Sequence, residues 1–486
     1  MPGDGGGGET VADGASSEDA GADGNTLLAS DAGQPDVATG DSSSGLPTEP
    51  DGGQVPAGCE NVTADPAKGL FVDGTNGADT TGCGAITAPC KTISQGIDAA
   101  YNTASMNQVY VANGTYVEAV TLKSGVSVFG GWEPGADGGA WGRPEAGCSQ
   151  ETTVIVGPAN ANVTVTAANG ESKLSTLSVL TKGASDVQPG ESIFGVVATG
   201  AFNGSSNSTT LSLVYVNIST AKGGDGVAGS TGDAGITPTS ACSASGDGGA
   251  SQTPGTQGPG GAAGSFSASG YAAVNGSEGV PGGNGSNGTS PGPFTCVTCV
   301  SGCMANGALG CSSTPSTSCG TAGQSGCGGG GGAGGSGGGS GGSSVALLAW
   351  DANVNLTMCV LKAGAGGNGA DGGPGGAPGT GSAGAAGVTQ PACDTQCGGL
   401  GLTGCSPNTP DAGLGGSAGG RGGKGALGGP GGDGAGGDSF AYVENGNAKV
   451  ILANDNFTAA NCFAGDAGLT PAGGNGAPGV SGIQGP

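Results

Sequence analysis

The 486-residue sequence contains no histidine, and it is poor in aromatic and charged side chains. Without imidazole the chain has no histidine general base, no serine–histidine dyad and no histidine-bound metal. Aromatic residues make up 4% and charged residues 10% of the chain, so a conventional core cannot account for its whole length. No stretch approaches the roughly 20 apolar residues of a membrane-spanning helix. These absences argue against several enzyme classes and against a membrane span.

Basic side chains are also scarce, because only 11 lysines and arginines stand against 37 aspartates and glutamates. The net charge is −26, and neither Arg143 nor Arg421 belongs to a basic cluster. Nucleic acids and anionic membrane surfaces would therefore be repelled. The partners that this composition permits are neutral glycans, cell-surface components, basic surfaces and divalent cations such as Ca²⁺.

Glycine is what the sequence has in excess, at 116 residues. It recurs at every third position in several runs, the longest of which extends from Gly413 to Gly437. A period of three differs from the periods of an α-helix and a β-strand, and it matches polyproline II, which has three residues per turn. Collagen is the competing interpretation, but the runs are poor in proline and interrupted by cysteines.

Residues 69–132 carry the clearest local pattern. Short runs rich in valine, such as Val109–Val111 and Val126–Phe129, predict strands separated by glycine-containing turns. Thr92–Tyr101 has its apolar residues at helical spacing, which predicts one short helix.

The same region resembles the right-handed parallel β-helices of the pectin-lyase-like superfamily. The residues that carry the resemblance are Asp73-Gly74, Pro89-Cys90-Lys91-Thr92-Ile93, Ile97, Ala100 and Val109 through Gly131. The resemblance implies a helical cap at the N-terminal end, and many members of the superfamily are non-catalytic surface proteins. The glycine-rich remainder is similar to bacterial surface proteins named by analogy with mycobacterial glycine-rich (PGRS) repeats.

We therefore predict an all-β fold: a right-handed parallel β-helix with a short N-terminal cap helix and glycine-rich polyproline II arms inserted at one corner. Three later segments repeat one order of strand, turn, strand, alanine and glycine run, which places the insertions at an equivalent corner of successive coils. The predicted divisions are an acidic disordered tether (1–58), the cap and first coils (59–221), a glycine/cysteine-rich insertion (222–343), a coil (344–362), a second insertion (363–438), a coil (439–463) and a glycine-rich tail (464–486).

Sixteen cysteines, an even number, predict disulfides and an oxidising compartment. Cys83 and Cys90 flank a proline-bearing turn, and Cys59 with Cys148 is a looser pairing. Both insertions contain the spacing C-x3-C-x7-C, which predicts a shared disulfide-tied tip (Cys299, Cys303 and Cys311; Cys393, Cys397 and Cys405). A structural zinc held by the first three of these thiolates together with Cys296 is the alternative.

Acidic residues supply the other candidate sites. Pectin-degrading enzymes of the superfamily use clustered aspartates with calcium and a basic residue, and the sequence shows no such set, so we predict no catalytic residues. Asp351 and Asp455, at related coils, are the pair that would favour an enzyme if they stacked. Four acids in or beside glycine runs could ligate calcium, although solvated acids are the simpler interpretation (Asp225, Asp371, Asp433 and Asp466).

The leading hypothesis is a non-enzymatic, secreted or cell-surface structural or adhesive protein. A calcium-dependent polysaccharide lyase or hydrolase and a calcium-stabilised extracellular scaffold are the alternatives. The sequence opens at Met1 without an apolar signal segment. The expected extracellular or cell-envelope location therefore depends on residues upstream of Met1 that would supply a signal peptide or a lipid anchor.

Overall fold

The computed structural model describes residues 62–143, 152–200, 209–242, 253–299, 316–389, 414–452, 462–463, 469 and 474–485. The chain divides into two units, Met1–Gln54 and Val55–Pro486, and every described residue belongs to the second. The predicted tether at 1–58 lies outside the described residues. Strands dominate the described part, where the only α-helix is α1 (Ile93–Tyr101). No helix there is long and apolar enough to cross a membrane.

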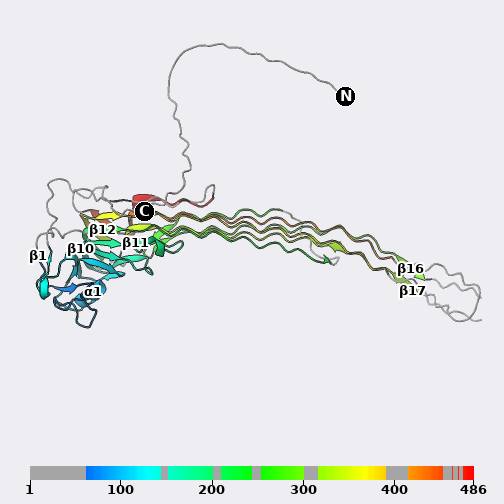
Figure 1. The fold of residues 1–486 in the computed structure, drawn as a ribbon. Coiled ribbons are helices and arrows are strands. Elements are labelled where there is room, and N and C mark those ends of the chain that lie inside the picture. The colour runs from blue at the N-terminus through cyan, green and yellow to red at the C-terminus, as the bar shows by residue number, and fades with distance from the viewer. Residues whose placement is uncertain are drawn as a thin grey trace, which may run out of the picture. The chain divides into compact units, whose positions relative to one another are not determined.

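Most strands lie in three faces, and the strands within each face are parallel. The chain passes through the three faces in turn (Figure 1). The first face contains β2 (Gly69–Val72), β3 (Gln108–Ala112), β6 (Ser127–Trp132), the first halves of β10 (Glu171–Leu180) and β12 (Thr209–Ser219), β20 (Ala352–Thr357) and β23 (Lys449–Leu452). The second contains β4 (Gly114–Val117), β8 (Thr153–Val156), the second halves of β10 and β12, β21 (Val360–Lys362) and β24 (Cys462–Phe463). The third contains β5 (Val120–Leu122), β9 (Val163–Ala168), β11 (Ile193–Thr199), β19 (Ser344–Trp350), β22 (Ser439–Asn445) and β25 (Ser481–Gly485).

Four pairs of short strands in the described part of the chain lie outside these faces, and all four are antiparallel. They are β1 (Val62–Thr63) with β7 (Gly142–Arg143), β13 (Ala241–Cys242) with β18 (Ser325–Gly326), β14 (Ser265–Ser267) with β15 (Gly270–Ala272), and β16 (Cys296–Cys299) with β17 (Ser316–Cys319). The last three pairs belong to the first glycine-rich insertion.

Aliphatic side chains stack along the inside of the three faces. On the first face, the register places five fully buried side chains one above another (Val109, Val128, Leu174, Leu213 and Leu356). Burying each side chain of this size contributes about 1.5–3 kcal/mol. Because a slip of one residue would turn the whole row outward, this stack also fixes the register of the strands.

The corner between the first and second faces is made by residues with left-handed backbone. Thr176, Tyr215 and Met358 have φ angles of 57°, 55° and 51°. The strand register on either side of Thr176 and Tyr215 places them at the same level of adjacent coils. Such a conformation costs of order 1–3 kcal/mol for a residue other than glycine. In return, β10 and β12 bend sharply without losing their hydrogen-bonded ladder.

The glycine-rich insertions leave the coils at the corner between the second and third faces. Residues 222–343 connect β12 to β19, and residues 363–438 connect β21 to β22. Buried hydroxyls brace this corner: Ser344 Oγ lies 2.7 Å from Thr220 Oγ1, and Ser439 Oγ donates to the Gly364 carbonyl over 2.7 Å. Successive insertions therefore start from hydrogen-bonded positions that lie next to one another.

Six glycine-rich segments run side by side (Figure 1), and we name them A (222–238), B (253–264), C (274–292), D (320–343), E (363–388) and F (414–438). Between E and D, the amides of Gly367, Ala370 and Gly373 donate to carbonyls of D that also step by three residues. E and F are antiparallel and hydrogen-bonded in the same way. A three-residue step on both partners is the pattern of segments with three residues per turn. These bonds link segments of one chain that run in both directions, unlike those of collagen.

Segments D and F have the most neighbours among the six, because D is hydrogen-bonded to A, C, E and F, and F is hydrogen-bonded to B, C, D and E. A Cβ atom added at Gly334 would overlap the carbonyl of Gly279 in C, and one added at Gly335 would overlap the carbonyl of Gly373 in E. Ala333 and Ser336 occupy the third position of the triplet, which faces A. The bundle therefore requires glycine at positions such as 334 and 335, where a Cβ atom would overlap a carbonyl of the neighbouring segment.

Replacing Gly335 by alanine should destabilise the protein, because the added methyl group would overlap the Gly373 carbonyl. Overpacking of this kind costs about 1–3 kcal/mol, which urea denaturation would detect as a lower free energy of unfolding. Gly142→Ala is the matched control, since a Cβ there meets nothing within 4 Å. Equal stabilities of the two variants would contradict the close approach of D and E.

Candidate functional site

Helix α1 is fixed at its start by hydrogen bonds to two side chains, Thr92 and Glu118. Thr92 Oγ1 accepts from the Gln95 amide over 3.3 Å. The Glu118 carboxylate accepts from the Ile93 and Ser94 amides over 2.7 and 2.9 Å. A carboxylate at this end complements the helix dipole and satisfies amides that have no partner within the helix. The helix starts one residue later than predicted, because Thr92 serves as its N-cap.

A cleft of about 790 Å³ lies beside α1, and the loop that follows β2 forms its other wall. Its lining includes Leu70, Thr81, Gln95, Asn102 and Met106. This volume falls within the range of small-molecule sites. Both acids that line the cleft are engaged: Asp98 pairs with Lys123 over 2.8 Å, and Asp79 accepts from the Lys91 and Thr92 amides. The acids of the cleft are thus charge-compensated or hydrogen-bonded. The cleft could not be predicted from local sequence pattern, because it depends on how the loop after β2 packs against α1.

Burial disfavours the charged form of Asp79, but hydrogen bonds from Thr92 and Lys91 outweigh it and lower the pKa of this carboxyl. The pKa of Lys123 is raised by its hydrogen bond with Asp98. Both groups are therefore charged near neutral pH. Asp79 stabilises its loop by hydrogen bonding, and Lys123 forms an ion pair with Asp98. Neither has the features of a general acid or base poised near pH 7.

Asp351, one of the two acids that would favour an enzyme, has a structural role at a corner of the coils. Its backbone is left-handed, with φ of 50°, and its carboxylate accepts from the Asn447 amide over 2.7 Å. Asp455, its proposed partner, lies outside the described residues. Arg143 is buried against the ring of Trp132, with its guanidinium carbon 4.6 Å from the ring centre, and burial lowers its pKa to about 10. The described residues bring no aspartate pair and base together.

Three of the four calcium candidates, Asp225, Asp371 and Asp433, lie in the described part of the chain, and they belong to no grouped metal site there. The Asp225 carboxylate contacts Lys222 Nζ over 2.7 and 2.9 Å, and it accepts from the Asn368 amide over 2.6 Å. Burial opposes ionisation of Asp225, and these two partners outweigh it, so the pKa of the carboxyl is lowered. Asp371 is exposed, and Asp466 lies outside the described residues. Within the described part of the chain, no three His, Cys, Asp or Glu side chains are grouped as a metal site.

Asp433, the remaining calcium candidate, is a buried crosslink between segments. Its two carboxylate oxygens accept from the amides of Gly372 in segment E and Asn475 in the tail, each over 2.9 Å. Asn475 returns the contact by accepting from the Asp433 amide over 3.0 Å, and its side chain donates to Gly258 in segment B. One aspartate and one asparagine therefore join four glycine-rich segments.

Three disulfides lie in the described residues, and Cys83–Cys90 joins two ends of the loop that forms a wall of the cleft. Cys242 pairs with Cys327 and Cys296 with Cys319, which ties segments of the first insertion together. Neither pairing follows the predicted C-x3-C-x7-C tips. Cys299 belongs to β16, while Cys59, Cys148, Cys303, Cys311, Cys393, Cys397 and Cys405 lie outside the described residues.

The Cys296–Cys319 bond removes one of the four thiolates proposed for zinc, because a disulfide sulfur is no longer an anionic ligand. The pairing follows from the antiparallel register of β16 and β17, which places these two cysteines opposite each other. The cysteine spacing alone contains no information on that register, so the sequence could not select this pair.

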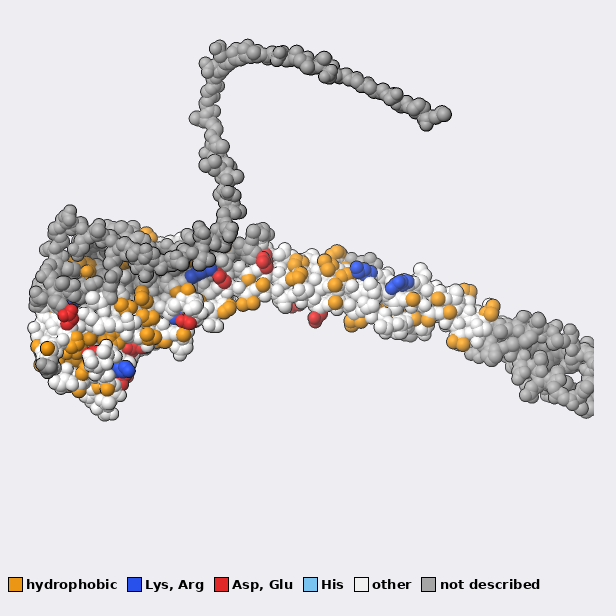
Figure 2. Space-filling model, in the orientation of Figure 1, with side chains coloured by type: hydrophobic (Ala, Val, Ile, Leu, Met, Phe, Trp, Pro, Cys, Tyr) orange, Lys and Arg blue, Asp and Glu red, His pale blue; other side chains and the backbone are white. Residues whose placement is uncertain are grey.

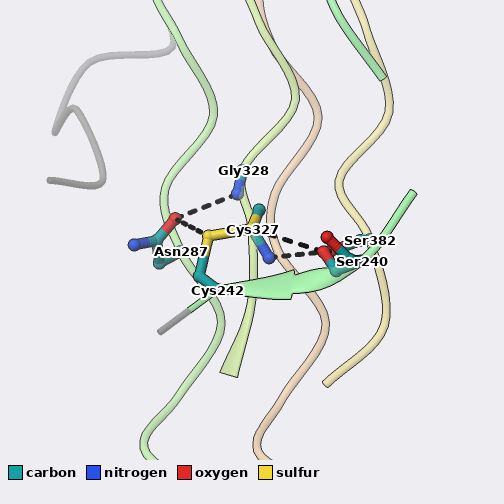
Figure 3. The surroundings of a disulfide bond; sticks show 6 residues. All are labelled: Ser240, Cys242, Asn287, Cys327, Gly328 and Ser382. Atoms are coloured by element: carbon teal, nitrogen blue, oxygen red, sulfur yellow. Dashed lines mark hydrogen bonds between the residues drawn. A yellow bond between two sulfur atoms is a disulfide. The ribbon is translucent and has the colours of Figure 1, made fainter. Parts of the chain in front are cut away.

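Hydrogen bonds surround the Cys242–Cys327 disulfide (Figure 3). The Cys327 amide donates to Ser382 Oγ over 2.9 Å, and that hydroxyl donates to the Ser240 carbonyl over 2.7 Å. Asn287 Oδ1 accepts from the Gly328 amide over 3.0 Å. This crosslink therefore joins the residues that follow segment A to segments C, D and E at one level of the bundle.

The comparisons with known proteins do not assign this chain to a family. No family model matches the chain, and no curated protein matches it. A solved structure described as pectin methylesterase from carrot is similar, with 13% sequence identity and a TM-score of 0.21. The similarity covers 34% of this chain and 51% of that chain, so this chain spans about half the length of the protein that it matches. A likeness of this size carries no argument about activity.

Loss of Cys242–Cys327 should destabilise the protein more than loss of Cys83–Cys90, because the two bonds close sequence separations of 85 and 7 residues. The chain-entropy model gives roughly 4–5 kcal/mol for the long loop and roughly 2 kcal/mol for the short one. The double variants Cys242→Ser/Cys327→Ser and Cys83→Ser/Cys90→Ser would be compared by urea denaturation. An equal or reversed order would show that the long crosslink adds no constraint.

Replacing Asp438 by asparagine should stabilise the protein at about pH 7 and change little at about pH 3. Burial raises the pKa of Asp438 above 3.8, although a hydrogen bond from the Val480 amide opposes this. The folded state thus holds the proton more tightly, and stability falls as the pH rises from 3.8 through the folded-state pKa. Asparagine keeps the 2.8 Å bond from Val480 without the charge.

Melting temperatures at the two pH values would measure this effect, with Asp186→Asn as an exposed control. A loss of stability at about pH 7 but not at about pH 3 would mean that the charged carboxylate is itself stabilising.

Proposed function

We propose that this chain is a non-enzymatic structural or adhesive protein of the cell surface or extracellular space. The observation that carries the proposal is the bundle of six glycine-rich segments that starts from one corner of the coils and is crosslinked by disulfides. Stable disulfides are characteristic of oxidising compartments. The acids that might have formed a catalytic or calcium site instead brace turns and join segments.

We further propose that the coils form a right-handed parallel β-helix. The parallel faces that the chain visits in turn support this assignment. Crossover connections between parallel strands of one sheet are right-handed in about 98% of cases. The role of the β-helix in this proposal is to hold the starts of the glycine-rich segments next to one another.

The bundle is suited to act as a spacer or surface coat. At about 3.1 Å per residue, a run of the length of segment D would extend roughly 70 Å. A single glycine-rich chain of that length would behave as a flexible coil. Backbone hydrogen bonds between neighbouring segments hold the segments in a fixed array instead. The face of the bundle seen in Figure 2 carries few charged side chains.

Labelling of intact cells tests the location. We expect a membrane-impermeant amine reagent to label the protein on intact cells, with a cytoplasmic protein as the unlabelled control. Gel mobility should change on reduction, because the described chain contains three disulfides. A protein that is found only inside cells with reduced thiols would contradict the proposal. Release of unsaturated uronides from pectin by the pure protein would favour the lyase alternative.

A further inference from the structure

The C-terminal tail adds to the bundle as a further segment. The Gly369 amide of segment E donates to the Leu469 carbonyl, and the Gly436 amide of segment F donates to the Ala477 carbonyl, each over 2.9 Å. Segments E and F therefore present backbone donors on an outer side, and an extended chain binds there through its carbonyls. Polyproline II chains suit this mode because they form no internal hydrogen bonds.

The same donors continue beyond the part that the tail covers. Gly375 and Gly384 follow Gly369 in segment E, and Lys424 and Leu427 precede Gly436 in segment F, all at multiples of three residues. The three-residue repeat keeps their amides on the side that the tail uses. None of these four amides has an acceptor among the described residues. We name this set the donor face.

The donor face is basic and partly apolar. Lys424 is exposed, and so is Arg421, whose guanidinium Nε donates to the Gly381 carbonyl over 3.1 Å. The apolar side chain of Leu427 is 53% exposed. Because the net charge of the chain is −26, this basic face is electrostatically complementary to the mostly acidic remainder of the protein.

Segment A presents the complementary groups. The carbonyls of Ala228, Thr231 and Ala234 have no donor in the described part of the chain, and all three side chains are small and exposed. Exposed carboxylates flank this row at Asp233 and at Asp371 of the adjoining segment E. We name this set the acceptor row. Ile236, which is 79% exposed, adds an apolar side chain.

We propose that the donor face of one copy of this chain binds the acceptor row of a second copy. Backbone N–H···O=C bonds would repeat the contacts that already join the segments within one chain. Arg421 and Lys424 would lie opposite Asp233 and Asp371, and Leu427 opposite Ile236. Because the two surfaces differ, each copy keeps one of them available for another copy, and association is open-ended rather than closed. This inference goes beyond the proposed location and does not depend on it.

Sedimentation velocity of the full chain over a range of concentrations tests the proposal. We expect association that weakens with salt, because paired surface charges are screened. The reversals Arg421→Glu/Lys424→Glu and Asp233→Lys/Asp371→Lys should each weaken association by at least about tenfold, since like charges would then face each other. An equimolar mixture of the two variants should associate again. Lys91→Glu/Lys449→Glu makes the same change of charge at exposed positions outside both surfaces and is the control.

Restored association in the mixture, with wild-type melting temperatures for each variant, would support the proposal. A wild-type chain that stays monomeric at every concentration would overturn it. Association that survives both reversals, or that is lost equally in the control, would also overturn it.

Discussion

The structure depends on backbone hydrogen bonds between segments that have three residues per turn. A polyproline II chain bonds nothing within itself, so each amide and carbonyl points outward and must find water or a neighbour. When the neighbour is another such segment, the two backbones approach so closely that a Cβ atom at the contact would overlap a carbonyl oxygen. The excess of glycine, the paucity of core-forming residues and the length of the insertions all follow from this constraint.

A bundle of this kind needs a starting point, because isolated segments have too little apolar surface to associate through a hydrophobic core. The coils supply it by stacking aliphatic side chains at a fixed register and by starting successive insertions at one corner. Thr220, Ser344 and Ser439 hold that corner through buried hydroxyls. The first residues of A and E and the last residues of D and F are therefore held close together. Disulfides and the Asp433–Asn475 crosslink then join segments far from it.

The period of three and the strand-like runs were sufficient to predict parallel coils with extended glycine-rich arms, because both depend on local pattern. The local Cys83–Cys90 pair was predictable from its spacing around a turn. The pairing of Cys296 with Cys319 was not, since these residues meet through the register of two strands that spacing does not encode. The role of Asp433 was not predictable for a related reason. Its carboxylate beside a glycine run is the kind of group that can bind calcium, but in the folded bundle it accepts hydrogen bonds from two amides that are distant in the sequence.

The distribution of glycine within each triplet nevertheless contains long-range information. Segments D and F, which each bond to four other segments, carry glycine at about two of every three positions, while A and B, which bond to two, carry it at about one. At many of the contacts of D and F, a Cβ atom would overlap a carbonyl of a neighbouring segment. Glycine is therefore most frequent in the two segments with four neighbours, and the nearly pure glycine run of residues 328–342 belongs to one of them.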